Sequence, residues 1–320
     1  MRSPAKINKA IFFLALWMIA INLIAGLLAE IMGWGMIIGT GIFQVVGIFV
    51  PFVFYLLVTK QSHHRVLAWK RLSLNNALIV AAITLAIQPM LQIIFRLASF
   101  IFTPVITDFL ELVETTPVWL SFLIIAILPS FFEEFWFRGA MYTKYREGGV
   151  SIRKTAIITG IFFGLMHMNF HQAVYAAVIG ILLAYILYYT RSIWSVILAH
   201  FINNGIHALL MYSSSYRGWM EGFDDRAGMF FLVMGIASLV MLPVVVLCIR
   251  QLVKYHAATE EPEVVQKPQD SQEPQQLIES NAESAATADI KEKVYTWGFW
   301  AALAIFVIIA LLIEVALRIM

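Results

Sequence analysis

The sequence contains little charge and almost no cysteine. Charged residues make up only 13% of its 320 residues, well below the roughly 25% of soluble domains. A chain that is 61% hydrophobic cannot cover its apolar surface with so few polar groups, which excludes an ordinary soluble protein. The single cysteine, Cys248, excludes an intramolecular disulfide and a cysteine-based metal site, and we interpret it as a buried structural thiol.

Long apolar runs are abundant instead. A helix needs roughly 20 residues to cross the hydrocarbon core. A marginal run, 152–168, ends in the polar segment His167-Met-Asn-Phe-His171, so we expect it to pack inside protein. The sequence predicts an all-α polytopic membrane bundle of about eight core transmembrane helices and a C-terminal ninth. The eight full-length runs are 8–30, 36–59, 75–102, 118–142, 170–190, 192–212, 228–250 and 297–317.

The charges between the runs predict the topology. Lysine and arginine favour the cytoplasmic side, and they fall in alternate loops that lie inside if the N-terminus is inside. We interpret the first run as a retained span, because no small-residue cleavage site follows it. We therefore expect a multi-pass protein of the cell membrane with a cytoplasmic N-terminus. The opposite loops carry the acidic residues Asp108, Glu111, Glu114, Glu221, Asp224 and Asp225.

The segment 254–296 differs from the rest of the chain. It is rich in Glu, Gln, Pro, Ser and Ala and nearly free of aromatic residues, a composition typical of disorder. The predicted organisation is a membrane-embedded core at 1–253, a disordered cytoplasmic linker at 254–296 and a C-terminal transmembrane helix at 297–320.

Two adjacent carboxylates, Glu133 and Glu134, interrupt the fourth run. A carboxylate at mid-bilayer costs several kcal/mol and usually faces a bundle interior or a wet cavity. Arg138 lies four residues after Glu134, on the same helix face, so we expect a structural ion pair. Glu133 lies about 100° further round the helix and has no basic partner at helical spacing, so it is the candidate for chemistry.

Histidines form two further polar clusters in apolar runs. His167 and His171 are four residues apart, and a satisfied core histidine is the simpler interpretation of His171. The second cluster lies on one helical stripe, because its offsets are three, four and seven. Counted from the nearest cytoplasmic basic residues at 1.5 Å per residue, Glu133, His167 and Asn204 lie roughly 17–20 Å deep, in one layer. This stripe consists of His200, Asn203, Asn204 and His207.

These groups suit hydrolysis of a peptide bond. A carboxylate and a histidine can deprotonate water, and a second imidazole with an asparagine amide can stabilise an oxyanion. The same Glu133, His167 and His200 set could hold a zinc ion. We favour the reaction without a metal or other cofactor, because asparagine is a poor zinc ligand.

Three motifs in chain order resemble those of the CPBP intramembrane proteases, which include the type II CAAX prenyl endopeptidases and the bacterial Abi proteins. The motifs are Glu133-Glu134-x-x-x-Arg138, Phe163-x-x-x-His167 and His200-x-x-x-Asn204, and the resemblance covers about 75–250. It implies that Glu133 and His167 activate water and that His200 and Asn204 form the oxyanion hole. Glu134 and Arg138 match positions with a structural role, and we place His171 with them as a supporting residue.

The sequence thus predicts an intramembrane endopeptidase acting on a membrane-associated peptide or protein, with the lipid bilayer as partner and no nucleic acid. A non-catalytic protein of the same fold, with an immunity or scaffold role, is the alternative. A transporter is disfavoured because no inverted repeat is evident. Substrate identity and oligomeric state do not follow from the chain.

Overall fold

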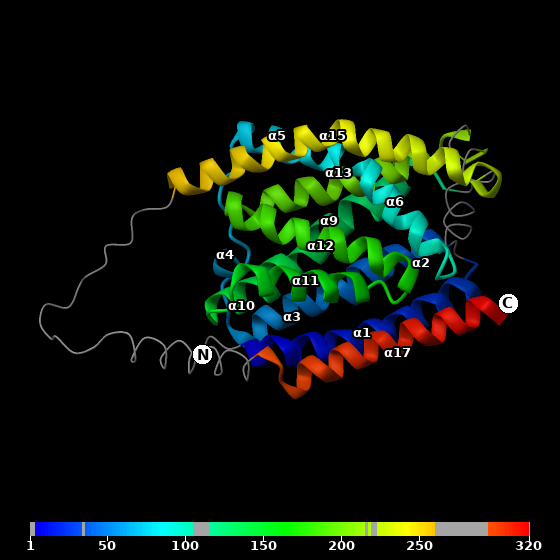
Figure 1. The fold of residues 1–320 in the computed structure, drawn as a ribbon. Coiled ribbons are helices and arrows are strands. Elements are labelled where there is room, and N and C mark those ends of the chain that lie inside the picture. The colour runs from blue at the N-terminus through cyan, green and yellow to red at the C-terminus, as the bar shows by residue number, and fades with distance from the viewer. Residues whose placement is uncertain are drawn as a thin grey trace, which may run out of the picture.

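The computed structural model describes residues 4–33, 36–104, 116–214, 217–218, 223–259 and 294–319, and no strand occurs among them. The predicted linker therefore lies mostly outside the described residues. So do the side chains of the acidic residues predicted for the side opposite the N-terminus. The loops around α4 (His63–Val66) and α10 (Tyr142–Glu147) lie at the same end of the bundle as the N-terminus (Figure 1).

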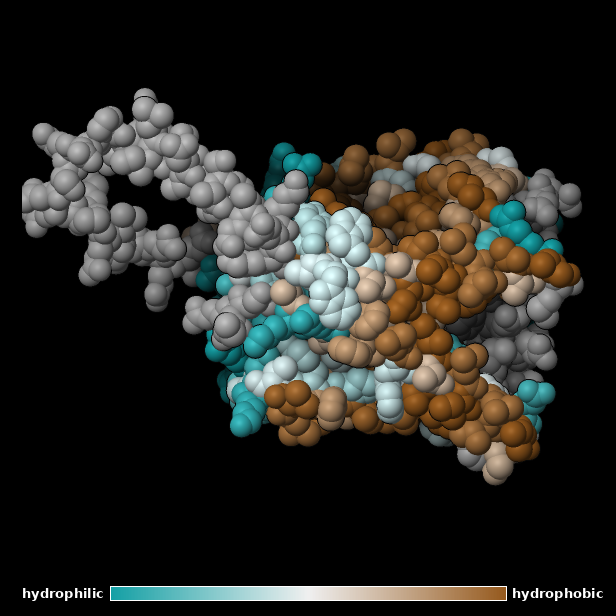
Figure 2. Space-filling view, turned by 90° about the horizontal axis from the view of Figure 1, so that it is seen from below, coloured by the Kyte–Doolittle hydropathy of each residue, from teal (hydrophilic) through white to brown (hydrophobic). Residues whose placement is uncertain are grey.

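The predicted helical membrane bundle is confirmed. In the described part of the chain, eight helical stretches are long and apolar enough to cross a membrane, including the predicted C-terminal one. Figure 2 shows hydrophobic residues gathered over the middle of one face, with hydrophilic residues towards its ends. The stretches are Pro4–Ile31, Ile37–Thr59, Leu74–Ser99, Val118–Glu147, Phe170–Thr190, Ile193–Met211, Arg226–Ala258 and Trp297–Ile319.

Several of these stretches are built from shorter segments. Proline has no N–H to donate within a helix, so the turn before it cannot keep regular hydrogen bonding. Two wide π-helical segments, η1 and η2, end just before Pro51 and Pro129, and the break between α5 and α6 precedes Pro89. The segments are α2 (Met36–Ile42), η1 (Phe43–Phe49) and α3 (Val50–Thr59); α5 (Leu74–Ala86) and α6 (Gln88–Ser99); and α8 (Val118–Ser121), η2 (Phe122–Ile127), α9 (Leu128–Glu134), η3 (Phe135–Met141) and α10.

The marginal run forms α11 (Ile152–Leu165), which is too short to cross a bilayer. More than half of its residues are buried, as expected for a helix packed inside protein. The remaining helices are continuous. They are α1 (Pro4–Ile31), α12 (Phe170–Thr190), α13 (Ile193–Met211), α15 (Phe223–Thr259) and α17 (Trp297–Ile319).

The helix α15 differs from expectation in two respects. It continues to Thr259, past the predicted core boundary at 253, with Pro243 inside it. It also lies at the edge of the bundle (Figure 1), so Cys248 is only partly buried and not the fully buried thiol expected.

The C-terminal helix α17 packs along α1, although the two come from opposite ends of the sequence (Figure 1). Near one end, Asn8 Nδ2 donates hydrogen bonds to Val294 O at 2.6 Å and Thr296 Oγ1 at 3.1 Å. At the other end, Glu314 Oε1 accepts from the backbone N–H of Thr103 at 3.1 Å and from Arg318 Nε at 2.8 Å. Polar contacts therefore fix α17 to the core at both ends.

The helices α11 and α12 approach each other closely at glycines, which brings the C-terminal end of α11 against the core. A Cβ atom added to Gly180 would lie 2.8 Å from Gly160 Cα, and one added to Gly164 would collide with the carbonyl oxygen of Ala173. Only glycine allows this separation of the two backbones. The contact sets the position of His167, which follows directly after α11.

We predict that Gly164→Ala lowers the thermal unfolding midpoint of the detergent-solubilised protein. The added methyl group overpacks a rigid backbone contact, which typically costs about 1–3 kcal/mol. Gly26→Ala is the matched control, because a Cβ atom there meets nothing within 4 Å. Equal midpoints for the two variants would show that the α11–α12 contact is looser than described.

Candidate active site

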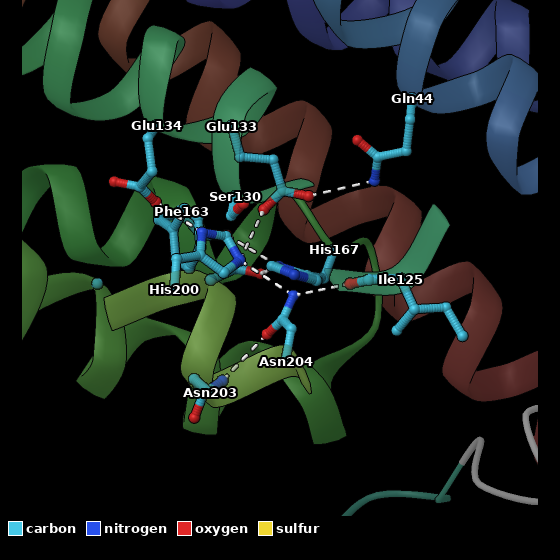
Figure 3. A network of polar contacts seen from close by, with 12 residues as sticks. Gln44, Ile125, Ser130, Glu133, Glu134, Phe163, His167, His200, Asn203 and Asn204 are labelled. Carbon is cyan, nitrogen blue, oxygen red and sulfur yellow. Dashed lines mark hydrogen bonds and ion pairs between the residues drawn. The ribbon is translucent and has the colours of Figure 1, made fainter. Parts of the chain in front are cut away.

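The adjacent carboxylates Glu133 and Glu134 lie at the C-terminal end of α9, and each contacts a different set of residues. Both are buried, with 4% and 0% of their surface exposed. Figure 3 shows the His200 ring below both of them. Glu134 Oε1 accepts a hydrogen bond from His200 Nδ1 at 2.8 Å, whereas Glu133 Oε2 lies 4.0 Å from His200 Nε2.

The expected pair between Glu134 and Arg138 is present, with Nη1 of the arginine 2.9 Å from Oε1 of the glutamate. Arg138 also donates through Nη2 to the carbonyl oxygen of Gly180 at 2.9 Å. Its guanidinium carbon lies 4.4 Å from the ring centroid of Phe163. Arg138 thereby connects η3 with α11 and α12 while it balances the charge of a fully buried carboxylate.

Glu133 faces away from this pair and has an unexpected partner. Gln44, on the π-helical segment η1, donates through Nε2 to Glu133 Oε1 at 3.3 Å. The other oxygen, Oε2, is buried and receives no hydrogen bond from the described residues. The sequence signal for Gln44 was a lone amide side chain in the apolar run 36–59, and only the tertiary fold brings it to Glu133. Glu133 thus keeps one carboxylate oxygen available.

His200 and Asn204 contact each other one turn apart on α13. Asn204 Nδ2 lies 3.1 Å from His200 Nε2 and donates to the carbonyl oxygen of Ile125 at 3.1 Å. An amide nitrogen only donates, and a carboxylate only accepts. In this arrangement His200 therefore carries its proton on Nδ1, towards Glu134, and accepts from Asn204 at Nε2.

His167 lies just beyond α11, at the bend before α12. Its Nδ1 lies 3.0 Å from the carbonyl oxygen of Phe163 and 3.3 Å from that of Gly164. Because carbonyl oxygens only accept, Nδ1 carries the proton, which leaves Nε2 as an acceptor. The backbone of α11 thus fixes both the tautomer and the ring orientation of His167.

Glu133, His167 and Asn204 line one cavity of about 200 Å³. No hydrogen bond joins Glu133 directly to His167 among the described contacts, so a small molecule can contact both. The rest of the wall is mainly apolar and comes from α1, α2, η1, η2, α9, the turn after α11 and the start of α12. Its members are Met18, Asn22, Thr40, Phe43, Gln44, Ile48, Ile124, Ile125, Pro129, Met166, Met168 and Gln172.

Three histidines of the sequence clusters do not line this cavity: His200, which contacts the lining residue Asn204, and two others. His171 is fully buried against Phe95, with ring centroids 4.3 Å apart. His207 faces Tyr175, and its Nε2 lies 3.1 Å from the hydroxyl oxygen. The structure therefore brings together Glu133, Glu134, Arg138, His167, His200 and Asn204, and leaves His171 outside.

The fit of a metal ion can be judged from the donor atoms. No group of three or more His, Cys, Asp or Glu side chains in the described part of the chain is arranged to hold one. His200 directs Nδ1 to Glu134, whereas its Nε2 lies 3.1 Å from Asn204 Nδ2 and 4.0 Å from Glu133 Oε2. The preference for a reaction without a metal therefore stays a prediction.

We predict that Arg138→Ala strongly destabilises the protein. Removing one partner of a buried ion pair leaves the other uncompensated and costs about 3–5 kcal/mol. Adding Glu134→Gln should restore part of the lost stability, but not all, because the contacts of Arg138 to Gly180 and Phe163 stay broken. The measurement is the thermal unfolding midpoint and the yield of folded protein.

Arg65→Ala is the control, because Arg65 pairs with Glu147 at 2.9 Å but has 52% of its side chain exposed. Exposed pairs contribute at most about 1 kcal/mol. An Arg138→Ala variant as stable as Arg65→Ala would contradict the structural role of the buried pair.

Comparisons with known proteins agree with the motifs. A family model described as "Type II CAAX prenyl endopeptidase Rce1-like" matches residues 115–206, which contain Glu133, His167, His200 and Asn204. No curated protein and no solved structure matches the chain. The resemblance predicted from the sequence is thus confirmed over this segment: the chain is a multi-pass membrane protein similar to the type II CAAX prenyl endopeptidases, which supports a protease embedded in the membrane.

Proposed function

We propose that the protein is an intramembrane endopeptidase that hydrolyses a peptide bond by means of water activated by Glu133 and His167. One observation carries the proposal: Glu133, His167 and Asn204 line the same cavity, and Glu133 keeps one carboxylate oxygen without a hydrogen bond from the described residues. A water molecule occupies about 30 Å³ in the liquid, so a cavity of about 200 Å³ accommodates water beside part of a substrate.

In the first step, Glu133 Oε2 takes a proton from water, and the water oxygen attacks the carbonyl carbon of the substrate. His167 orients the water by accepting its other hydrogen at Nε2, because Nδ1 is held by the backbone. The tetrahedral intermediate then collapses, the C–N bond breaks, and the proton held by Glu133 passes to the leaving amine. Gln44 keeps the Glu133 carboxylate in position through its hydrogen bond to Oε1.

His200 and Asn204 are proposed to stabilise the oxyanion. In the resting arrangement, the amide of Asn204 donates to His200 Nε2. His200 can donate from Nε2 only in the form that carries a proton on both ring nitrogens, and in that form the amide hydrogen of Asn204 is also released to the oxyanion. Glu134 Oε1, 2.8 Å from His200 Nδ1, holds the ring in place.

The substrate is proposed to be a membrane-associated peptide or protein, because most residues that line the cavity belong to membrane-spanning helices. We further propose that the N-terminus and the 254–296 segment are cytoplasmic and that the protein resides in the cell membrane. The basic residues of the loops around α4 and α10, at the same end as the N-terminus, support this orientation.

We predict that Glu133→Gln abolishes cleavage and leaves folding intact. The substitution removes the base but keeps the side-chain shape, and general-base catalysis typically contributes about 10²–10⁴-fold. The measurement is a mass-spectrometric comparison of the peptides released by cells that express the wild type or the variant. A peptide whose release requires Glu133 then identifies a substrate, whose synthetic precursor serves for kinetics.

Glu147→Gln is the control for this experiment, because Glu147 pairs with Arg65 and Lys144 at the end of α10 and does not line the cavity. It should leave peptide release unchanged. A Glu133→Gln variant that expresses normally and releases the same peptides at the same rate would remove Glu133 from the mechanism.

We predict that Asn204→Ala lowers turnover by about 10²–10³-fold, as the loss of one oxyanion donor does elsewhere. The KM should change little, because this donor acts mainly on the transition state. Wild-type activity should also survive prolonged treatment with a metal chelator. Purified enzyme that contains stoichiometric zinc, loses activity when it is removed and regains activity when it is returned would overturn the metal-free mechanism.

A further inference from the structure

A second polar cluster lies inside the bundle, next to the candidate active site, and has no role in the proposed chemistry. It consists of Gln88 on α6, Tyr175 on α12, and Asn203 and His207 on α13. All four belong to membrane-spanning stretches, and Asn203 is almost fully buried. Gln88 and His207 also lie outside the segment matched by the family model.

Hydrogen bonds connect this cluster to Asn204 in one chain. The Tyr175 hydroxyl donates to Asn203 Oδ1 at 2.8 Å, and Gln88 Nε2 donates to the same oxygen at 3.2 Å. Asn203 Nδ2 then donates to Asn204 Oδ1 at 3.0 Å. Because the Tyr175 hydroxyl proton is used on Asn203, its oxygen accepts from His207 Nε2, 3.1 Å away.

The direction of this chain is fixed at its outer end. Gln88 Nε2 also donates to the carbonyl oxygen of Thr84 at 2.9 Å, so the Gln88 amide cannot turn round without placing two oxygens together. With two donors directed at it, the Asn203 position must be the amide oxygen, and the amide nitrogen must face Asn204. The Asn204 oxygen therefore faces Asn203, and the Asn204 nitrogen faces His200 and Ile125 (Figure 3).

We propose that Tyr175 and Gln88 are positioning residues that hold the amide of Asn204 with its N–H groups towards the reacting centre. The inference rests on the proposed function, in which Asn204 donates to the oxyanion. Without the two donors, nothing in the cluster disfavours an Asn203 amide that presents its oxygen to Asn204. The Asn204 amide must then give up its contact with Asn203 or turn over and lose its contacts with Ile125 and His200, so its N–H groups are no longer held from both sides. An Asn204 oxygen turned towards the site would repel a developing negative charge.

A purely structural role of the cluster and a positioning role predict different results for its variants. If the cluster only joins α6, α12 and α13, its loss should lower stability and should act on turnover independently of Asn204. If it orients Asn204, its loss should lower kcat at nearly unchanged KM and stability, and the effect should disappear once Asn204 is gone.

The first test is Tyr175→Phe, which removes the hydroxyl and keeps the ring. We expect kcat to fall by about tenfold, which corresponds to the loss of one hydrogen bond of about 1.4 kcal/mol. The loss should be no larger, because Gln88 still donates to Asn203 in this variant. The matched control is Tyr185→Phe, on the same helix, whose hydroxyl has no hydrogen-bond partner among the described residues. Gln88→Met is the second variant, and together with Tyr175→Phe it should lower kcat further than either change alone. The probe is the synthetic precursor of the peptide whose release requires Glu133.

The decisive experiment is a double-mutant cycle with Asn204→Ala. Tyr175→Phe should lower kcat in the wild-type background and change the residual kcat of Asn204→Ala by less than about twofold. A drop of the same size in both backgrounds would overturn the positioning role, and so would a silent Tyr175→Phe in an enzyme that needs Asn204. Full activity of Asn204→Ala itself would instead refute the proposed oxyanion role.

A structure of the Tyr175→Phe, Gln88→Met double variant tests the same inference without any activity. The amide of Asn204 should turn over, and its contact with the carbonyl oxygen of Ile125, now 3.1 Å, should open beyond hydrogen-bond distance. An unchanged contact in this variant would show that Asn204 keeps its orientation without the two donors.

Discussion

The carboxylate of Glu134 is the group on which the rest of the site depends. It is completely buried, and its Oε1 accepts hydrogen bonds from two side chains. Arg138 Nη1 lies 2.9 Å and His200 Nδ1 lies 2.8 Å from this oxygen. A charge in this position is tolerated only when its partners are held in place, because the desolvation of an isolated carboxylate costs many kcal/mol. The requirement links α9, η3 and α13 in one arrangement, and Arg138 extends the link to α12 through Gly180.

The surroundings of the neighbouring Glu133 differ from those of Glu134. Glu134 contacts Arg138 and His200. The adjacent Glu133 faces the cavity, and its carboxylate accepts one long hydrogen bond from Gln44. Two identical side chains thus have different surroundings, which is the condition under which paired carboxylates take different roles in other sites. The π-helical segments contribute to this arrangement, since η1 presents Gln44 to Glu133 and η3 presents Arg138 to Glu134.

The polar interior extends beyond the three motifs. From Gln88 and His207, hydrogen bonds run through Tyr175 and Asn203 to Asn204, and from there to His200 and Glu134. In an apolar bundle each such group must find a partner inside the protein, because lipid supplies none. The network therefore has few alternative arrangements, which is a property suited to a site that must hold donors in a fixed direction.

The sequence by itself determined the helical membrane bundle, the short internal helix and the pairing of Glu134 with Arg138. These follow from local rules: run length, hydropathy and the four-residue spacing on one helix face. It also indicated that Glu133, His167, His200 and Asn204 lie at one depth, although depth alone does not say which side chains face one another. Only the tertiary structure decided that His200 contacts Glu134, that His171 packs against Phe95, and that Gln44 and Tyr175 join the network. The physical reason is that these contacts join residues 28 to 89 positions apart, or depend on the rotation of one helix against another. Such rotations are set by packing, here by the glycine contact of α11 with α12, which no single helix encodes.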